Sequence, residues 1–243
     1  MTEKRRSDDV EQTVAIIGAL DEEVELIARS LDDARHLERS KQASLDVVAG
    51  NLLKADGTRL RVVATVGGMG TVNAAATTQH LIDTYQPEAV IFSGIAGNLN
   101  PSLHINDVVL GGTLRYLDSD MRLIGQFAPH SEEFHSDQHL IDVADHALTQ
   151  MDITHIVGII ASGDYFVDTQ EKTQQVVRLT GADAVEMEGA AVCHVAARNS
   201  VPALVIRALS DNADTDYEVF KEFDISEYAD TAARLVIRIL AEL

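Results

Sequence analysis

The chain has 243 residues, of which 46% are hydrophobic, and its 39 acidic and 19 basic residues give a formal net charge of -20. This length suffices for one large domain with a substantial core, and neither the four prolines nor a shift in composition marks a boundary between two domains. Because so acidic a chain has no electrostatic attraction for nucleic-acid phosphates or anionic lipid surfaces, neither partner is expected.

The polar residues 1–12 precede the first apolar segment, and we expect them to form a flexible tail outside a domain that spans residues 13–243. They lack the apolar core of a secretory signal peptide, and no apolar run in the chain approaches the ~20 residues of a membrane span. The single cysteine, Cys193, rules out an intramolecular disulfide framework. A cytoplasmic protein is therefore expected.

Apolar segments typical of strands alternate along the chain with segments of helical periodicity. Strands are expected at 13–18, 44–53, 60–68, 88–97, where the strand runs into a glycine turn, 105–111, 155–164, 182–188 and 202–211. Helices are expected at 22–31, 70–85, 137–150, 169–180, 189–200 and 224–243, and the segment 115–137 is irregular. This alternation predicts a single-domain α/β fold with a central, largely buried sheet flanked by helices.

Glycine and acidic residues gather where the predicted strands end. Ligands in folds of this class bind at the carboxyl ends of the strands. Six such ends carry residues unlike core, namely "GALDEE", "GGMG", "SGIAGN", "SGDYF", "VEME" and "RALSDNAD". Their number predicts one shared binding site.

Each of these segments also has a simpler explanation. Glu22 and Glu23 open a helix, where the helix dipole favours any acidic side chain. Asp211 follows a strand and could cap a helix, and His194 lies on an apolar helix face, where a core histidine is common. No residue spacing typical of a metal site and no glycine-rich phosphate-binding motif is present, so neither a metal nor a cofactor is expected.

Together the segments resemble the nucleoside phosphorylase and nucleosidase superfamily, and most closely the 5′-methylthioadenosine/S-adenosylhomocysteine nucleosidases. The resemblance covers nearly the whole chain and is carried by "AIIGALDEEVELI", "GMGTVNAA", "SGIAG", "ASGDYF", "AVEMEGAAVCHVA" and "VIRALSDNAD". It implies a three-layer fold with a mixed, twisted sheet and a homodimer. It also implies hydrolysis of the N-glycosidic bond of methylthioadenosine and S-adenosylhomocysteine, with 5′-deoxyadenosine as a further candidate substrate.

The resemblance also implies a role for individual residues. Asp211 would protonate the leaving adenine, and Glu23 would activate the attacking water. Glu188 would accept hydrogen bonds from the ribose as positive charge develops, and Arg207 would help to hold the water site. Phe166 would stack on the base. The other substrate-binding residues implied are Gly97, Val167, Glu186, Met187, Met69, Ile95 and Ser210.

The residue types suit this chemistry without the family name. Cleavage of an N-glycoside needs an acid at the leaving group, a base for water and a negative charge near an oxocarbenium-like sugar. Three carboxylates can supply the acid, the base and the negative charge if their environments give them different pKa values. Two alternatives stay open: a phosphorylase of the same fold, which would need cationic residues for phosphate, and a nucleoside-binding protein without catalysis.

In two places the chain departs from the family pattern. The family usually carries a hydroxyl residue where this chain has Ile95, which cannot hydrogen-bond to water or ribose. The segment "FAPHSEEFHSD" has no residue-level match, so the sequence does not identify what closes over the 5′ end of the substrate.

Overall fold

The computed structural model describes residues 12–18, 21–37, 44–54, 56–213 and 226–243. The strands are β1 (Thr13–Gly18), β2 (Asp32–Leu37), β3 (Val47–Leu53), β4 (Arg59–Val66), β5 (Ala89–Asn98), β6 (Val108–Tyr116), β7 (His155–Ser162), β8 (Ala184–Glu186) and β9 (Ala203–Asp211). The helices are α1 (Asp21–Arg29), α2 (Thr71–Tyr85), α3 (Met121–Ile124), α4 (Gln138–Gln150), α5 (Gln170–Thr180), α6 (Gly189–Arg198) and α8 (Ser226–Glu242). The expected tail at 1–12, apart from its last residue, and the expected first two residues of the last helix lie outside the described part of the chain.

The expected α/β fold with a mixed sheet flanked by helices is confirmed. The nine strands lie in the order β2-β3-β4-β1-β5-β8-β7-β6-β9, with a further pairing between β5 and β9. Because β9 pairs with both β6 and β5, the strands β5, β8, β7, β6 and β9 close into a ring. The β1 strand is parallel to its two neighbours β4 and β5 and is buried along its whole length.

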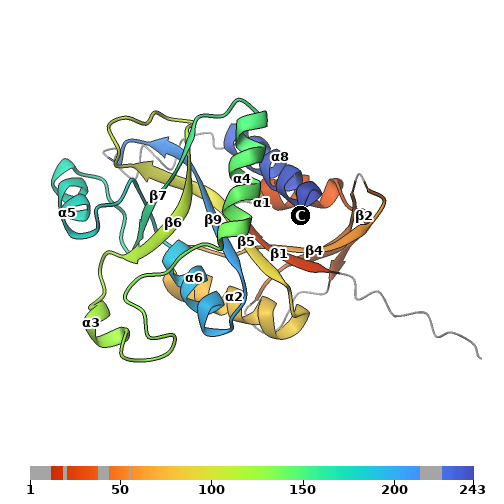
Figure 1. The fold of residues 1–243 in the computed structure, drawn as a ribbon, viewed down its shortest axis with the longest axis horizontal. Helices are drawn as coiled ribbons and strands as arrows, with labels where there is room; N and C mark the ends of the chain where they lie inside the picture. Colours follow the sequence, from red (N-terminus) through yellow and green to blue (C-terminus); the bar gives the residue numbers. More distant parts are fainter. Residues whose placement is uncertain (1–11, 19–20, 38–43, 55, 214–225) are drawn as a thin grey trace, which may run out of the picture.

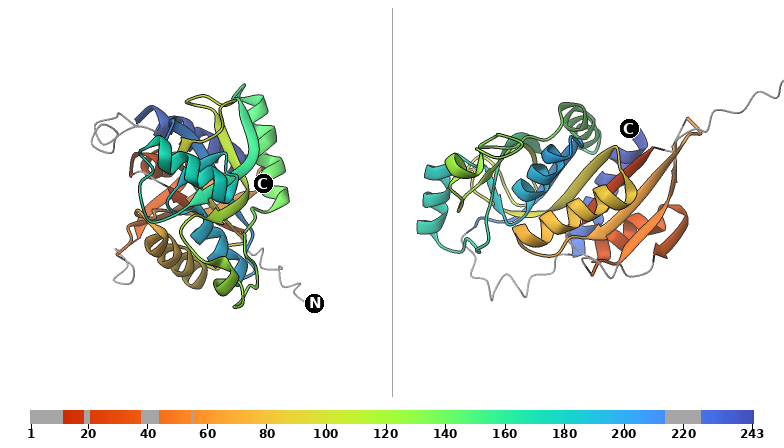
Figure 2. Two further views of the ribbon diagram at one scale, coloured as in Figure 1. Left: turned by 90° about the vertical axis from the view of Figure 1, so that its left-hand side faces the viewer. Right: turned by 90° about the horizontal axis from the view of Figure 1, so that it is seen from below.

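Helices cover both faces of the sheet (Figures 1 and 2). Side chains alternate between the faces of a strand, so Val14 and Ile16 of β1 pack in one core with residues of α1, α4 and α8. Ala15 and Ile17 pack in a second core with residues of α2 and α6. These two cores produce the three layers. In the part of the chain that the structure describes, no helix is long and apolar enough to cross a membrane.

The strand β5 corrects one expectation about the site. A glycine turn was expected within residues 94–97, but the strand continues to Asn98. Gly97 pairs with Asp211 of β9 on one side and with Val185 of β8 on the other. A Cβ atom added at Gly97 would lie 2.9 Å from the Cβ of Ala213. The glycine is therefore required for close packing between strands, and three of the predicted strand ends meet here.

Two elements were not expected from the sequence. The segment 32–37 has no apolar alternation, yet it forms β2 by antiparallel pairing with β3. The short helix α3 lies inside the irregular segment 115–137. In both places pairing or local turn geometry decides the structure, and apolar periodicity does not report either of them.

Candidate active site

A cavity of about 310 Å³ lies at the meeting point of the strand ends. Its wall includes every sequence-predicted site residue except Glu23, namely Met69, Ile95, Gly97, Phe166, Val167, Glu186, Met187, Glu188, Arg207, Ser210 and Asp211. The wall also includes Gly18, Phe92 and Tyr165, which the sequence analysis did not single out. Tyr165 could have been found from its place beside Phe166, whereas nothing in the apolar run of β5 distinguishes Phe92.

Glu23 lies directly behind the cavity wall. It belongs to the first turn of α1, and its side chain is buried, with the residue only 1% exposed. A Cβ atom added at Gly18 of the wall would lie 3.3 Å from Glu23 Oε2. A carboxylate needed only for the helix dipole would stay in solvent, so burial at this wall points to a function inside the site.

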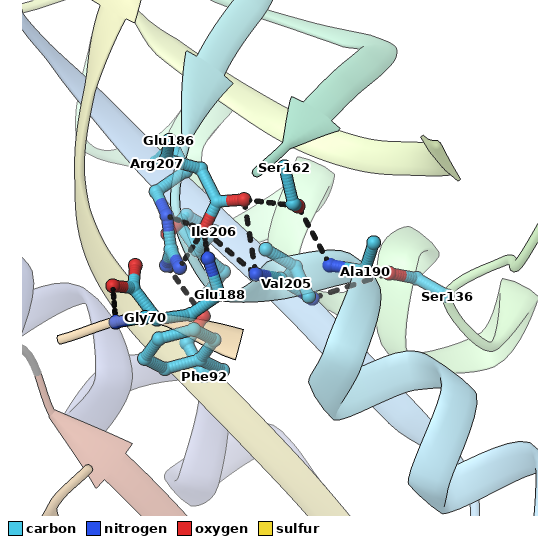
Figure 3. A network of polar contacts seen from close by, with 11 residues as sticks. Gly70, Phe92, Ser136, Ser162, Glu186, Glu188, Ala190, Val205, Ile206 and Arg207 are labelled. Carbon is cyan, nitrogen blue, oxygen red and sulfur yellow. Dashed lines mark hydrogen bonds and ion pairs between the residues drawn. The ribbon is translucent and has the colours of Figure 1, made fainter. Parts of the chain in front are cut away.

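Glu186 and Arg207 form a buried ion pair at the floor of the site (Figure 3). Arg207 Nη2 and Nε donate to Glu186 Oε2 at 2.6 Å and 3.2 Å. The Gly189 amide donates to both carboxylate oxygens, and the Ser162 hydroxyl donates to Oε1. A buried ion pair is tolerated when further hydrogen bonds satisfy its oxygens. Glu186 therefore lines the cavity, but both oxygens of its carboxylate already accept hydrogen bonds from other groups of the chain.

Arg207 is held from a third direction by Phe92. The carbon at the centre of the guanidinium lies 3.9 Å from the centroid of the Phe92 ring, a geometry in which the ring attracts the cation. Arg207 Nη1 also donates to the carbonyl of Ile206 at 3.0 Å. The cation is thus buried in a defined orientation beside the cavity.

Glu188 directs its carboxylate away from the helix that it begins. It is the N-cap residue of α6, yet its side chain makes no capping hydrogen bond there. Glu188 Oε1 accepts a hydrogen bond from the Gly70 amide at 2.7 Å (Figure 3). Burial, and next the nearby Glu186 carboxylate, raise the pKa of Glu188 to about 7, although Arg207 and the Gly70 amide oppose the shift.

Asp211 is the last residue of β9 and lies in the cavity wall. Its Oδ1 accepts from the Ala213 amide at 2.6 Å, and its Oδ2 accepts from the Ser210 hydroxyl at 2.9 Å. Ala213 packs in the same small core as Val167, so Asp211 lies on the side of the loop at 163–168. The helix-capping explanation for Asp211 depends on residues 214–225, which are outside the described ranges.

Two further residues were weighed from the sequence. Ile95 lines the cavity and is partly exposed to it, so an apolar side chain faces the ligand space there. His194 lies outside this cavity, stacked on Phe134 with 4.3 Å between ring centroids, and the Tyr116 hydroxyl is 3.3 Å from its Nδ1. Burial lowers the pKa of His194. Within the described ranges, no group of histidine, cysteine and acidic residues is arranged to hold a metal ion.

Comparison with known proteins gives concordant results. The family model of the phosphorylase superfamily matches residues 13–241. A 5′-methylthioadenosine/S-adenosylhomocysteine nucleosidase from Shewanella sp. (strain W3-18-1) is 34% identical over 236 residues, which is 95% of this chain and 99% of the relative. A crystal structure of such a nucleosidase from Neisseria meningitidis, in complex with methylthio-immucillin-A, is 31% identical with a TM-score of 0.85 and covers 96% of this chain and 100% of its own. A futalosine hydrolase mutant structure from Helicobacter pylori strain 26695 is 29% identical with a TM-score of 0.83, covering 96% and 100%.

Proposed function

The chain belongs to the phosphorylase superfamily, and on this premise we propose that it is a purine nucleosidase, an N-glycoside hydrolase. Its substrates are 5′-methylthioadenosine and S-adenosylhomocysteine, which the name of the 34% identical relative contains. The products are adenine and the corresponding 5-thioribose. The arrangement of three carboxylates around one cavity, with Asp211 and Glu188 in its wall and Glu23 behind the wall at Gly18, carries this proposal.

Each carboxylate has one step in the reaction. Asp211, beside the loop that carries Phe166, gives a proton to the imidazole ring of the adenine while the bond from the anomeric carbon to the purine nitrogen breaks. The bonding electrons leave with the purine, so positive charge develops on the ribose, where the carboxylate of Glu188 stabilises it. Glu23 takes a proton from the water that attacks the anomeric carbon.

The other cavity residues support these three groups. Glu186 holds Arg207, because its oxygens already accept hydrogen bonds from the chain. Ser210 orients Asp211 through the bond between its hydroxyl and Oδ2. Phe166 stacks on the base, the Val167 backbone reads the edge of the base, and Met69 and Met187 pack against the sugar and its 5′ substituent. Gly97 allows close approach of the β5 backbone to the ligand.

Water is the nucleophile because the cavity offers no free cation to a phosphate ion. Arg207 is the one cationic side chain among the described residues of the cavity wall, and Glu186 neutralises it. Phosphate recognition normally uses charge-assisted hydrogen bonds from arginine or lysine. A phosphorylase is therefore not favoured, and a binding protein without catalysis would have no need to keep Glu23 buried at the wall.

The experiment is an assay of adenine release from methylthioadenosine in buffers with and without phosphate. The proposal expects the same rate in both and free 5-methylthioribose as the product. A strict requirement for phosphate, with a ribose 1-phosphate product, would establish a phosphorylase instead. Tight binding of methylthioadenosine without any adenine release would establish a binding protein.

We also propose that the enzyme is a homodimer. The helix α3 and the residues after it expose large apolar side chains, with Leu123 61% and Phe127 72% exposed. These two side chains, with Ile124, Ala128, His194 and Arg198, surround a surface hollow beside α6. Apolar patches of this kind are typical of interfaces between subunits. The sequence analysis had assigned no function to the segment around α3. A location in the cytoplasm stays a prediction.

A further inference from the structure

Two segments from distant parts of the sequence meet at the mouth of the cavity. The loop that follows β7 contributes Tyr165, Phe166 and Val167 to the cavity wall. The turn at residues 67–70, between β4 and α2, contributes Gly68 and Met69. The proposed function places adenine against the loop and the sugar near the turn. The contact that joins the two segments therefore affects both ends of the substrate.

Asp164 makes this contact with both oxygens of its carboxylate. Its Oδ1 accepts from the Thr71 amide at 2.7 Å, and its Oδ2 accepts from the Thr71 hydroxyl at 2.6 Å. Gly70, the N-cap residue of α2, has no side chain to cap the helix. The capping group that most helices take from their own N-cap residue is thus supplied here by the loop after β7.

The preceding amide in the chain, that of Gly70, is bound by a residue of the cavity wall. Gly70 N donates to Glu188 Oε1 at 2.7 Å, so the amides of residues 70 and 71 are held by carboxylates from two different segments. Gly70 has φ +93, and a Cβ atom added there would lie 3.1 Å from Asp164 Oδ1. A side chain at residue 70 would therefore crowd Asp164, and any shift of the turn moves the amide whose hydrogen bond Glu188 accepts.

The Asp164 backbone is itself anchored on a third segment. Its amide donates to Asp118 Oδ2 at 2.8 Å, shortly after the end of β6. Asp164 thus has hydrogen bonds to residues that follow β6 and to residues that follow β4, in addition to its place after β7. A residue needed only to cap α2 would require no such anchor.

We propose that Asp164 is a positioning residue: its paired hydrogen bonds to Thr71 hold the turn at 67–70 against the loop after β7. This contact sets the width of the adenine slot, which is the part of the cavity beside Tyr165, Phe166 and Val167, and the place of the Gly70 amide beside Glu188. The kinetic readouts of this inference rest on the proposed function. Adenine binding does not require turnover and tests the inference separately.

The chain offers a matched control for this contact. Asp56 Oδ1 accepts from both the amide and the hydroxyl of Thr58, at 2.8 Å and 2.6 Å, in the turn between β3 and β4. Neither residue belongs to the cavity wall. The pair therefore repeats the Asp164–Thr71 chemistry at an exposed place without a ligand.

The test compares Asp164→Ala, Thr71→Val and Thr71→Ser with Asp56→Ala and Thr58→Val. For each variant we would measure kcat and KM for methylthioadenosine across pH, the Kd of adenine by calorimetry, and Tm. We expect Asp164→Ala to raise both KM and the adenine Kd roughly tenfold, the effect of losing one or two charge-assisted hydrogen bonds. Thr71→Val should show part of this effect, and Thr71→Ser, which keeps the hydroxyl, should behave as the unchanged enzyme.

The pH profile adds a readout that a purely structural cap would not change. The Gly70 amide lowers the pKa of Glu188, so freeing the turn should move the acidic limb of kcat/KM to higher pH in Asp164→Ala. The Asp56 and Thr58 variants should leave the limb, KM and the adenine Kd as they are, whatever they do to Tm.

Several outcomes would overturn the inference. If Asp164→Ala has a lower Tm but an unchanged KM, adenine Kd and acidic limb, the contact serves only as a helix cap. If Asp164→Ala does not fold, equal adenine affinity in Thr71→Val and Thr71→Ser leads to the same conclusion. Absence of adenine release by the unchanged enzyme would refute the proposed function alone, whereas absence of adenine binding would refute the slot and this inference with it.

Discussion

Arg207 and Glu186 form an ion pair of 2.6 Å whose side chains are only 1% and 3% exposed. Removal of one member of such a pair leaves an uncompensated charge in the interior. Glu186→Gln should therefore lower the free energy of unfolding by ~3–5 kcal/mol. Chemical denaturation followed by circular dichroism measures this loss.

The double variant Glu186→Gln with Arg207→Met provides the control. It removes both charges, so it should be more stable than Glu186→Gln alone, while adenine release stays strongly reduced. If the double variant is less stable than either single variant, the attraction between the two charges exceeds the free-energy cost of removing them from water. Our account of the buried ion pair would then be wrong.

A second prediction concerns pH. Glu188 must be ionised to stabilise a cationic sugar, and its pKa is raised to about 7. We expect kcat/KM to fall below pH 7 and to approach a tenfold loss per pH unit. A profile that stays level down to pH 5 would mean that Glu188 is not required as an anion in the free enzyme.

The same shift has the opposite effect on stability. A carboxyl whose pKa is raised on folding contributes stability below its ordinary pKa of 4.5 and loses it as the pH rises toward 7. Glu188→Gln should therefore be more stable than the unchanged enzyme at pH 8, by on the order of 1–3 kcal/mol, although it is inactive. Equal stability of the two proteins at pH 8 would contradict the raised pKa.

The sequence predicted the parts of this site that consist of chemical groups at strand ends. Glu188 and Asp211 could be found because charged residues at the ends of apolar strands stand out from a core pattern, whereas Arg207 lies inside β9 and was identified through the family resemblance. The sequence alone could not show that Glu186 and Glu188, two residues apart, have different partners. That difference follows from the short strand β8, whose end turns Glu186 toward Arg207 and Glu188 toward Gly70.

The strand β5 shows the opposite limitation. Its glycines suggested a turn, because glycine in a sequence signals conformational freedom. In the fold, Gly97 is needed because β8, β9 and Ala213 leave no space for a side chain. Such long-range packing has no local signature, and the same is true of β2, which is a strand only through its pairing with β3.

A third prediction tests Ile95, which lines the cavity at a position where the family resemblance led us to expect a hydroxyl residue. Ile95→Thr keeps the branched shape and adds a hydroxyl that can bind the water or the ribose. One neutral hydrogen bond corresponds to ~2–10-fold in kcat/KM. We expect a gain of that size for methylthioadenosine in steady-state assays. Ile95→Val controls for the smaller volume, and equal rates for the two variants would show that the hydroxyl has no role.

A fourth prediction tests the dimer. Phe127→Asp places a charge on the apolar surface beside α3, where Phe127 is 72% exposed. We expect monomers in sedimentation velocity at micromolar concentration and reduced adenine release. Leu53→Asp is the matched control, since Leu53 is 57% exposed at the end of β3. The neighbours of β3 in the sheet, β2 and β4, lie on the opposite side of the molecule from α3 (Figure 1). An active enzyme that sediments as a ~26 kDa monomer before any substitution would refute the dimer.

The last prediction assigns the acid. Asp211 lies at the end of the cavity where the base is expected, and a general acid contributes ~10²–10⁴-fold only when the leaving group needs a proton. Asp211→Asn keeps the size of the side chain and can still accept from the Ala213 amide, but it has no acidic proton. We expect a loss of at least ~10²-fold on methylthioadenosine, with an unchanged circular dichroism spectrum.

A riboside with nitrophenolate as its leaving group separates this role from a structural one. Nitrophenolate departs as a stable anion, so Asp211→Asn should slow its release much less than the release of adenine. Glu23→Gln should slow both substrates, because each still needs an activated water. The ratio of the two rates within each variant is the decisive quantity, since it cancels differences in folding and in enzyme concentration. If Asp211→Asn slows both substrates equally, Asp211 holds the site together through Ser210 and Ala213, and another group is the acid.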